Sequence, residues 1–151
     1  RIDHHRLRLA DHVPQAQPLA RISLADLFLD TAPYNAHTTA SDALWAGVPV
    51  LTCPGLTFPS RVAASILTAA DLPELIARDR DHYREMALHW ASHPNDLRDL
   101  RRKLAATRDL TPLFDTQGYS RDLEALYLRM WQRRQAGQPP ATLAPISFRE
   151  G

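Results

Sequence analysis

Apolar residues form short continuous runs in the first half of the chain and helical stripes in the second half. The short runs end at polar or proline-containing segments, as strands and short helices in a compact α/β domain do. The predicted elements of the first half are strands at residues 6–13, 25–30 and 48–52 and helices at residues 19–24, 39–46 and about 59–67. The order strand, helix, strand, helix predicts a parallel sheet with helices on both faces.

From residue 73 onward the apolar positions recur every three or four residues, which indicates helices. Pro94 and Pro112 divide this region, and the last helix is predicted over about 119–136, ending near Gly137. Its apolar stripe predicts that it docks on another surface. The stripe consists of Leu123, Leu126, Tyr127, Met130 and Trp131.

The fold class predicted by this pattern is a Rossmann-like α/β domain followed by a helical C-terminal portion. A doubly wound sheet of this kind usually has five or six strands, and the sequence supplies only about three. We therefore expect residues 1–137 to be most of such a domain, with its first strands upstream. Residues 138–151 are rich in proline and without periodicity, so we expect an extended or disordered tail.

Composition supports a soluble globular protein and argues against two classes of partner. The 151 residues are 44% hydrophobic and 23% charged, with a formal net charge of +1. This balance gives no overall positive electrostatic field that would attract nucleic acid or an anionic membrane. No apolar run reaches the roughly 20 residues that cross a bilayer. The single Cys53 cannot form an intramolecular disulfide, which favours a reducing compartment, and we expect a cytoplasmic protein.

The candidate chemistry lies in the stretch DTAPYNAHTTASD at residues 30–42, between a predicted strand and a predicted helix. Ligands in open α/β sheets collect beyond the carboxyl ends of strands, and a helix N-terminus offers free N–H groups to an anion. His37, Thr38 and Thr39 can add donors to a phosphate, and Asp42 can accept from a ribose hydroxyl. A nucleoside diphosphate fits this arrangement.

A purely structural interpretation of the same residues stays open at this point. Thr39 and Asp42 have the spacing of a capping box, so both can serve only to start the helix. His37 can be a loop residue hydrogen-bonded to backbone.

A longer resemblance bears on this choice. The run ADLFLDTAPYNAHTTASDALWAGVPVLTCPG, followed by SRVAAS at residues 60–65, resembles the donor-binding half of O-GlcNAc transferases. These enzymes move N-acetylglucosamine from UDP to Ser or Thr of proteins. The resemblance is strong over residues 19–67 and extends, through TPLFDTQGYSRDLEALYLRMW, to about residue 137.

The resemblance implies the C-terminal, nucleotide-binding domain of a bacterial-type enzyme with the GT-B fold. By position, His37, Thr38 and Thr39 correspond to diphosphate contacts, Asp42 to the ribose partner, and Arg21 to an arginine near the nucleotide. Gln15 and Pro18 stand where animal enzymes have a lysine and a histidine beside the uridine, so recognition of the base differs here, with Gln15 as a candidate contact.

The resemblance further implies an inverting reaction without a metal or other cofactor. UDP-GlcNAc is the implied donor, and a protein or peptide is the implied acceptor. The phosphate-contacting lysine and the essential histidine of the family lie upstream, so no catalytic residue is assigned within this chain. Two other functions remain open: a noncatalytic nucleotide-sugar-binding module, and a related transferase that glucosylates Asn.

Other reactive side chains favour structural roles. Cys53 has no histidine placed to activate it, so a structural thiol is favoured over a nucleophile. His89 and His93 have a spacing that can chelate zinc, but Pro94 ends their helix and no third ligand is near, so no metal site is predicted. Arg61 is predicted to pair with a strand-end carboxylate such as Asp30, and a role in organising the phosphate pocket is the alternative.

Overall fold

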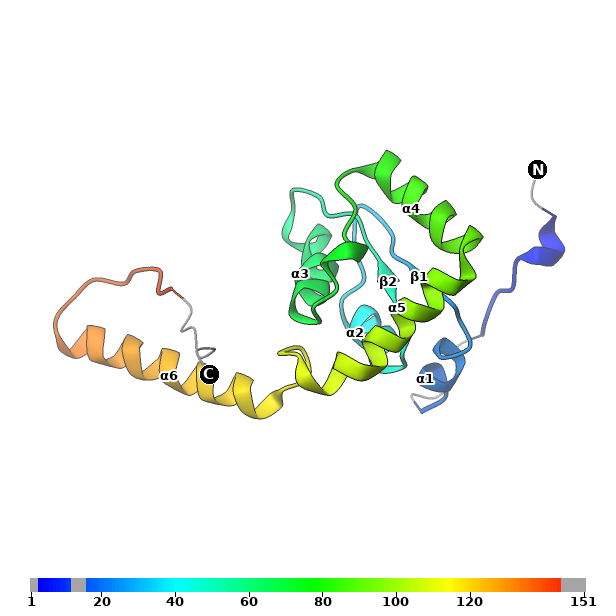
Figure 1. Ribbon diagram of the computed structural model, residues 1–151. Helices are drawn as coiled ribbons and strands as arrows, with labels where there is room; N and C mark the ends of the chain where they lie inside the picture. The colour runs from blue at the N-terminus through cyan, green and yellow to red at the C-terminus, as the bar shows by residue number, and fades with distance from the viewer. Residues whose placement is uncertain (1–2, 12–15, 145–151) are drawn as a thin grey trace.

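The computed structural model describes residues 3–11 and 16–144 and shows a small parallel sheet surrounded by helices (Figure 1). Strand β1 (Phe28–Leu29) pairs in parallel with β2 (Val50–Leu51), with Phe28 opposite Val50. A parallel bridge between Thr52 and Ile76 adds a third segment on the far side of β2. Val50 and Leu51 are both fully buried, so the sheet is covered on both faces at β2, as the apolar run predicts.

The helices follow the predicted order with shifted boundaries. They are α1 (Ala16–Ile22), α2 (Thr38–Trp45), α3 (Val62–Ala69), α4 (Arg80–Ser92), α5 (Pro94–Thr107) and α6 (Thr116–Gln135). Short 3₁₀ helices lie at His4–Arg6, Phe58–Ser60, Pro73–Leu75 and Arg108–Leu110. Gly47, with φ of +78°, follows α2 in the left-handed conformation that glycine adopts without strain, and so ends that helix as predicted.

The hydrophobic core lies between the sheet and helices α2, α3 and α5. Its members come from widely separated parts of the chain, which ties the predicted strand–helix units to the helical second half. The core includes Ala40, Ala43, Leu44, Val48, Val50, Ala63, Leu67, Leu72, Leu75, Leu97, Leu100 and Leu104. Leu97, Leu100 and Leu104 recur every three or four residues on the helix after Pro94, so the helical periodicity predicted for this region is confirmed there.

The predicted strand at residues 6–13 is wrong over the part that the structure describes. Residues 4–6 form a 3₁₀ helix, and residues 7–11 pair with no strand among the described residues. Leu7 and Leu9 are exposed, so their alternation with polar residues does not mark a buried face. A segment with so few alternating residues does not form a strand unless a neighbouring strand supplies hydrogen bonds to its backbone.

Helix α6 extends away from the rest of the chain (Figure 1). Residues 138–144 turn back along it, where Arg129 and Arg133 donate to the carbonyl oxygens of Ala144 and Pro139. The stripe expected to dock is largely exposed, since Tyr127, Met130 and Trp131 are each more than half exposed. None of the helices in the described ranges combines the length and apolar character that a membrane crossing requires.

Candidate functional site

Three of the predicted site residues meet in one hollow at the carboxyl end of β1. His37, Thr38 and Thr39 line a cavity of about 490 Å³ at the start of α2. Thr31 and Tyr34 of the preceding loop line the same cavity. The structure thus places the predicted donors at the edge of a parallel sheet where ligands collect.

A buried carboxylate holds this loop in place. Asp30, only 8% exposed, directly follows β1. Its Oδ1 accepts hydrogen bonds from the amides of Thr31 (2.8 Å) and Ala36 (2.6 Å), and its Oδ2 accepts one from the hydroxyl of Thr52 (2.6 Å). Thr52 follows β2, so one side chain joins the carboxyl ends of both strands to the residue before His37. Hydrogen bonds to an ionised acceptor are stronger than neutral ones, which makes Asp30 the main support of the loop.

Further bonds fix the same loop from both sides. The amide of Asn35 donates to the carbonyl of Pro59, and its side-chain Nδ2 donates to the carbonyl of Thr31. From α4, the hydroxyl of Tyr83 donates to the carbonyl of Asp30 at 2.8 Å. Burial raises the pKa of this hydroxyl above its ordinary value, and the Asp30 carboxylate raises it further, so it stays a donor at neutral pH.

The N-cap of α2 lies two residues before the Thr39 that the capping box predicts, which corrects that prediction. His37 is the N-cap, and its side chain makes no capping hydrogen bond. Thr39 therefore lies inside the helix, and Thr39 and Asp42 do not form the reciprocal pair. Within the described part of the chain, the amides and hydroxyls of Thr38 and Thr39 donate to no partner. Both side chains are exposed, so these four donors remain available to a ligand.

His37 is oriented by contacts with three residues. Its Nε2 lies 3.3 Å from the carbonyl oxygen of Pro59. Because a carbonyl only accepts, a hydrogen bond there requires the proton on Nε2. The neutral ring then offers an acceptor at Nδ1, and only the protonated ring has a second N–H to donate to a phosphate. The ring stacks on Tyr34, with centroids 4.9 Å apart, and meets Phe58 edge-on at 6.3 Å.

Two further predicted contacts, Asp42 and Arg21, do not line this hollow. Asp42 is partly exposed one turn further along α2. The guanidinium of Arg21 donates to the carbonyl of Asp11 at 2.9 Å. Gln15 lies outside the described residues. The structure therefore brings together the three predicted phosphate contacts, and Asp42, the predicted ribose contact, does not line the same hollow.

Two predictions about other side chains have different outcomes. Arg61 does not pair with Asp30: it is exposed at the start of α3, and the three partners of the Asp30 carboxylate are Thr31, Ala36 and Thr52. His89 and His93 stack with ring centroids 4.3 Å apart where α4 ends. Pro94 begins α5, which confirms the predicted break.

Cys53 lies in a second hollow at the same edge of the sheet, beside Arg78, Asp79 and Arg80. Burial raises the pKa of its thiol above the ordinary value, and the Asp79 carboxylate raises it further, whereas Arg80 has a smaller, opposite effect. A raised pKa leaves little thiolate at neutral pH, which is the opposite of what a nucleophile needs. This result supports the structural role expected for Cys53.

The pKa of Cys53 predicts a slow, pH-dependent alkylation. We expect the rate of iodoacetamide labelling to reach half its maximum above the value of about 8.5 that an unperturbed thiol shows. Asp79→Asn, which keeps a capping side chain for α4, lowers that midpoint because it removes a neighbouring negative charge. Mass spectrometry of the labelled peptide over a pH series measures both. A midpoint at or below that of an unstructured cysteine peptide contradicts the assignment.

Sequence analysis did not assign Asp30 and Tyr34 to the site. The signal for Asp30 was available, because a carboxylate that directly follows a buried strand rarely remains there without partners. The orientation of Tyr34 depends on the path of the loop and has no comparable signal in the sequence.

Comparisons with known proteins show the family of the chain. The model of the family described as "Glycosyl transferase family 41" matches residues 1–123. A UDP-N-acetylglucosamine–peptide N-acetylglucosaminyltransferase of Caenorhabditis elegans is 36% identical over 138 residues, which is 91% of this chain and 12% of that protein. A probable enzyme of the same name from Arabidopsis thaliana is 38% identical over 131 residues, 86% of this chain and 13% of that protein. The chain thus spans about an eighth of the length of these relatives.

Among solved structures, an O-GlcNAc transferase variant of Thermobaculum terrenum is similar with a TM-score of 0.79 and 35% identity. The match covers 85% of this chain and 25% of that chain. It confirms the predicted fold class, an α/β part of a GT-B glycosyltransferase.

Proposed function

Because this chain belongs to glycosyl transferase family 41, we propose that it is the UDP-GlcNAc-binding part of a protein O-GlcNAc transferase and that the hollow at the start of α2 holds the diphosphate. The observation that carries this proposal is the set of four donors on Thr38 and Thr39, which point from a helix N-terminus at the sheet's carboxyl edge and have no partner among the described residues. Such a terminus favours anions through its free amides and its dipole.

Each predicted contact has a chemical role in this proposal. The amides and hydroxyls of Thr38 and Thr39 donate to phosphate oxygens, and His37 in its protonated form adds an N–H through Nδ1. Asp42 accepts from a ribose hydroxyl, while Arg21 and Gln15 contact the nucleotide further from the phosphates. The exposed ring of Tyr34, which stacks on His37, provides an apolar surface beside the diphosphate for the sugar.

The proposed reaction is an inverting transfer without a metal. An oxygen of the acceptor hydroxyl bonds to the anomeric carbon as the bond from that carbon to the β-phosphate oxygen breaks, and UDP leaves with the electron pair. The hydroxyl proton passes to a base outside this chain. Negative charge develops on the diphosphate during this step, and preorganised donors at that position lower the barrier.

The proposed domain organisation is that predicted from the sequence. Residues 1–137 form most of the C-terminal nucleotide-sugar-binding domain, with its first strands supplied by the upstream part of the enzyme, and residues 138–151 form a tail. The match covers only 25% of the solved relative, so most of that chain has no counterpart here. The remaining catalytic groups, including the phosphate-contacting lysine, belong to the upstream part.

UDP is expected to stabilise this chain against thermal unfolding. A ligand that binds only the folded state at 100 times its dissociation constant adds about 2.7 kcal/mol to the free energy of unfolding. Differential scanning fluorimetry with UDP, and with uridine as a control without phosphates, measures the effect. Thr38→Val is expected to reduce the shift with UDP. Equal stabilisation by uridine and UDP contradicts a diphosphate site.

Transfer of GlcNAc to a peptide, measured with the upstream part present, separates an enzyme from a noncatalytic binding module.

A further inference from the structure

The second hollow lies beside the proposed diphosphate site, across a single loop. Ala32 and Pro33 line the second hollow, and their neighbours Thr31 and Tyr34 line the first. The second hollow has a volume of about 380 Å³. A ligand that extends out of the first hollow over this loop therefore reaches the second.

Two arginines line the second hollow. Arg78 and Arg80 are both exposed, and neither guanidinium forms an ion pair or a hydrogen bond within residues 3–11 and 16–144. The carboxylate of Asp79 accepts from the amide of His82 at 2.8 Å, so it is directed at the start of α4. The thiol of Cys53 adds no negative charge at neutral pH, because its pKa is raised by burial. The second hollow thus has an excess of positive charge that suits an anionic group.

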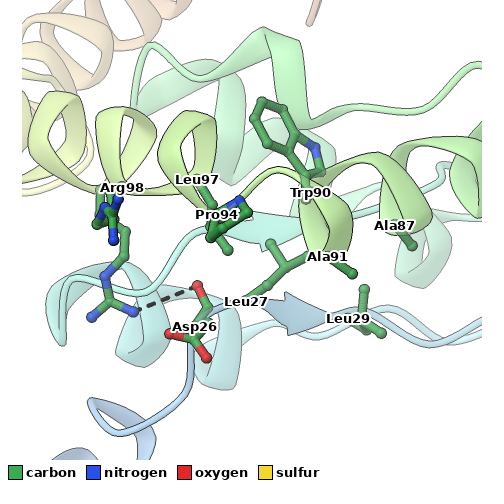
Figure 2. A pocket seen from close by; sticks show the side chains of 10 residues that line it. Asp26, Leu27, Leu29, Ala87, Trp90, Ala91, Pro94, Leu97 and Arg98 are labelled. Carbon is green, nitrogen blue, oxygen red and sulfur yellow. Dashed lines mark hydrogen bonds between the residues drawn. The ribbon is translucent and has the colours of Figure 1, made fainter.

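The arginines of a third cavity, the groove between β1 and helices α4 and α5, are bonded within the protein (Figure 2). There Arg98 donates to the side chain of Asn95, and Arg101 donates to the carbonyl oxygens of Ala25 and Asp26. Those guanidiniums hold segments of the chain together. The two guanidiniums of the second hollow have no such role among the described residues, so they are available to a ligand.

Large apolar side chains surround the two hollows and are mostly exposed. Tyr34 in the first hollow is 64% exposed, and Leu56 in the second is 99% exposed. Phe58, which lies edge-on to His37, is 73% exposed. Exposed apolar side chains grouped in this way mark interaction sites, and aromatic ones are enriched in interfaces with proteins. An inorganic anion needs only the cations, whereas a polypeptide uses the apolar side chains as well.

We propose that the second hollow binds an acidic side chain of the acceptor polypeptide through Arg78 and Arg80, while the hydroxyl to be modified lies at the first hollow. The proposal rests on the proposed function. A guanidinium binds a carboxylate through paired N–H groups, which makes it selective for Asp and Glu. Because only one loop separates the hollows and an extended chain advances about 3.3 Å per residue, the acidic residue lies within about four residues of the acceptor Ser or Thr.

The test uses a chimera in which this chain replaces its matched quarter of the Thermobaculum terrenum enzyme. The acceptors are serine peptides that carry one Glu, Gln or Lys, placed in turn at each of about four positions on either side of the serine. At the preferred position, Glu should lower the KM for the peptide about 5-fold relative to Gln, with kcat little changed, and high salt should weaken this preference. Anisotropy of the same peptides carrying a fluorophore, with UDP present, measures their binding even where no transfer occurs.

Charge reversal tests the two arginines directly. Arg78→Glu with Arg80→Glu should make Lys the preferred residue at the same position, by a similar factor. The neutral pair Arg78→Gln with Arg80→Gln should abolish the preference without reversing it. Arg121→Glu with Arg134→Glu makes the same change of net charge at exposed positions of α6 and should leave the preference for Glu intact. Circular dichroism checks that each variant is folded.

Three results would overturn the proposal. One is the absence of any charge preference in the unmodified chimera. Another is a preference that the α6 variant alters as much as the charge-reversed one. The third is a rise in KM for UDP-GlcNAc, rather than for the peptide, when Arg78 and Arg80 are reversed, since the arginines would then serve the nucleotide. Stabilisation by UDP is scored separately: a reversible peptide preference without it rejects the nucleotide site alone, and stabilisation without a peptide preference rejects the acidic subsite alone.

Discussion

Replacing Asp30 by alanine is expected to lower the free energy of unfolding by about 3–5 kcal/mol. The carboxylate is buried and accepts from two amides and one hydroxyl, so its removal leaves the donors of Thr31, Ala36 and Thr52 without their acceptor. A buried donor without a partner costs about 1–3 kcal/mol. Asp30→Asn should also destabilise, because its NH₂ group faces these donors with a donor of its own. Urea denaturation followed by circular dichroism measures the loss.

The matched control is Asp122→Ala, which removes an exposed carboxylate from α6. Surface substitutions of this kind usually change stability by no more than about 0.5 kcal/mol. Because Asp30 also holds the residue before His37, the variant should lose the stabilisation by UDP together with the ordered loop. An Asp30→Ala protein as stable as the control would show that the loop is supported from elsewhere.

Much of the fold can be predicted from local pattern. The runs around Phe28 and Val50 are strands, although only the second is buried and Leu29 of the first is exposed. Pro94 divides two helices, and Gly47 and Gly137 end helices in left-handed conformations. These features depend on periodicity and on backbone preferences that a residue carries wherever it stands. The absence of a strand around Leu7 and Leu9 could not be predicted, because an alternating segment forms a strand only when a neighbouring strand is available.

The candidate site is predictable in part for the same reason. His37, Thr38 and Thr39 follow a strand and precede a helix, so their place at the sheet's edge follows from chain order. The N-cap is His37, two residues before the predicted Thr39, and this changes the role of Thr39 from a capping side chain to a free donor. The support of the loop by Asp30 and Thr52 joins residues 22 positions apart, which no local pattern specifies.

Among these variants, Thr39→Val should cause the largest decrease in the rate of GlcNAc transfer. Valine keeps the volume and the β-branch of threonine and removes only the hydroxyl, which has no intramolecular partner in the described part of the chain. Folding should therefore be little affected. If the hydroxyl stabilises charge that develops on the leaving diphosphate, losing it should raise the barrier by about 2–4 kcal/mol, a decrease in kcat of about 10²- to 10³-fold.

The measurement requires the complete catalytic region. A chimera in which this chain replaces its matched quarter of the Thermobaculum terrenum enzyme supplies that region, and UDP-GlcNAc and a peptide acceptor are the substrates. Thr39→Ser keeps the hydroxyl and should retain most of the activity, whereas Thr68→Val removes a hydroxyl that donates to the carbonyl of Ala64 on α3 and should leave transfer unchanged. A rise in KM for UDP-GlcNAc with kcat unchanged would place the hydroxyl in ground-state binding, because uniform binding energy does not lower the barrier from the bound state. Unchanged kcat and KM would exclude Thr39 from the donor site altogether.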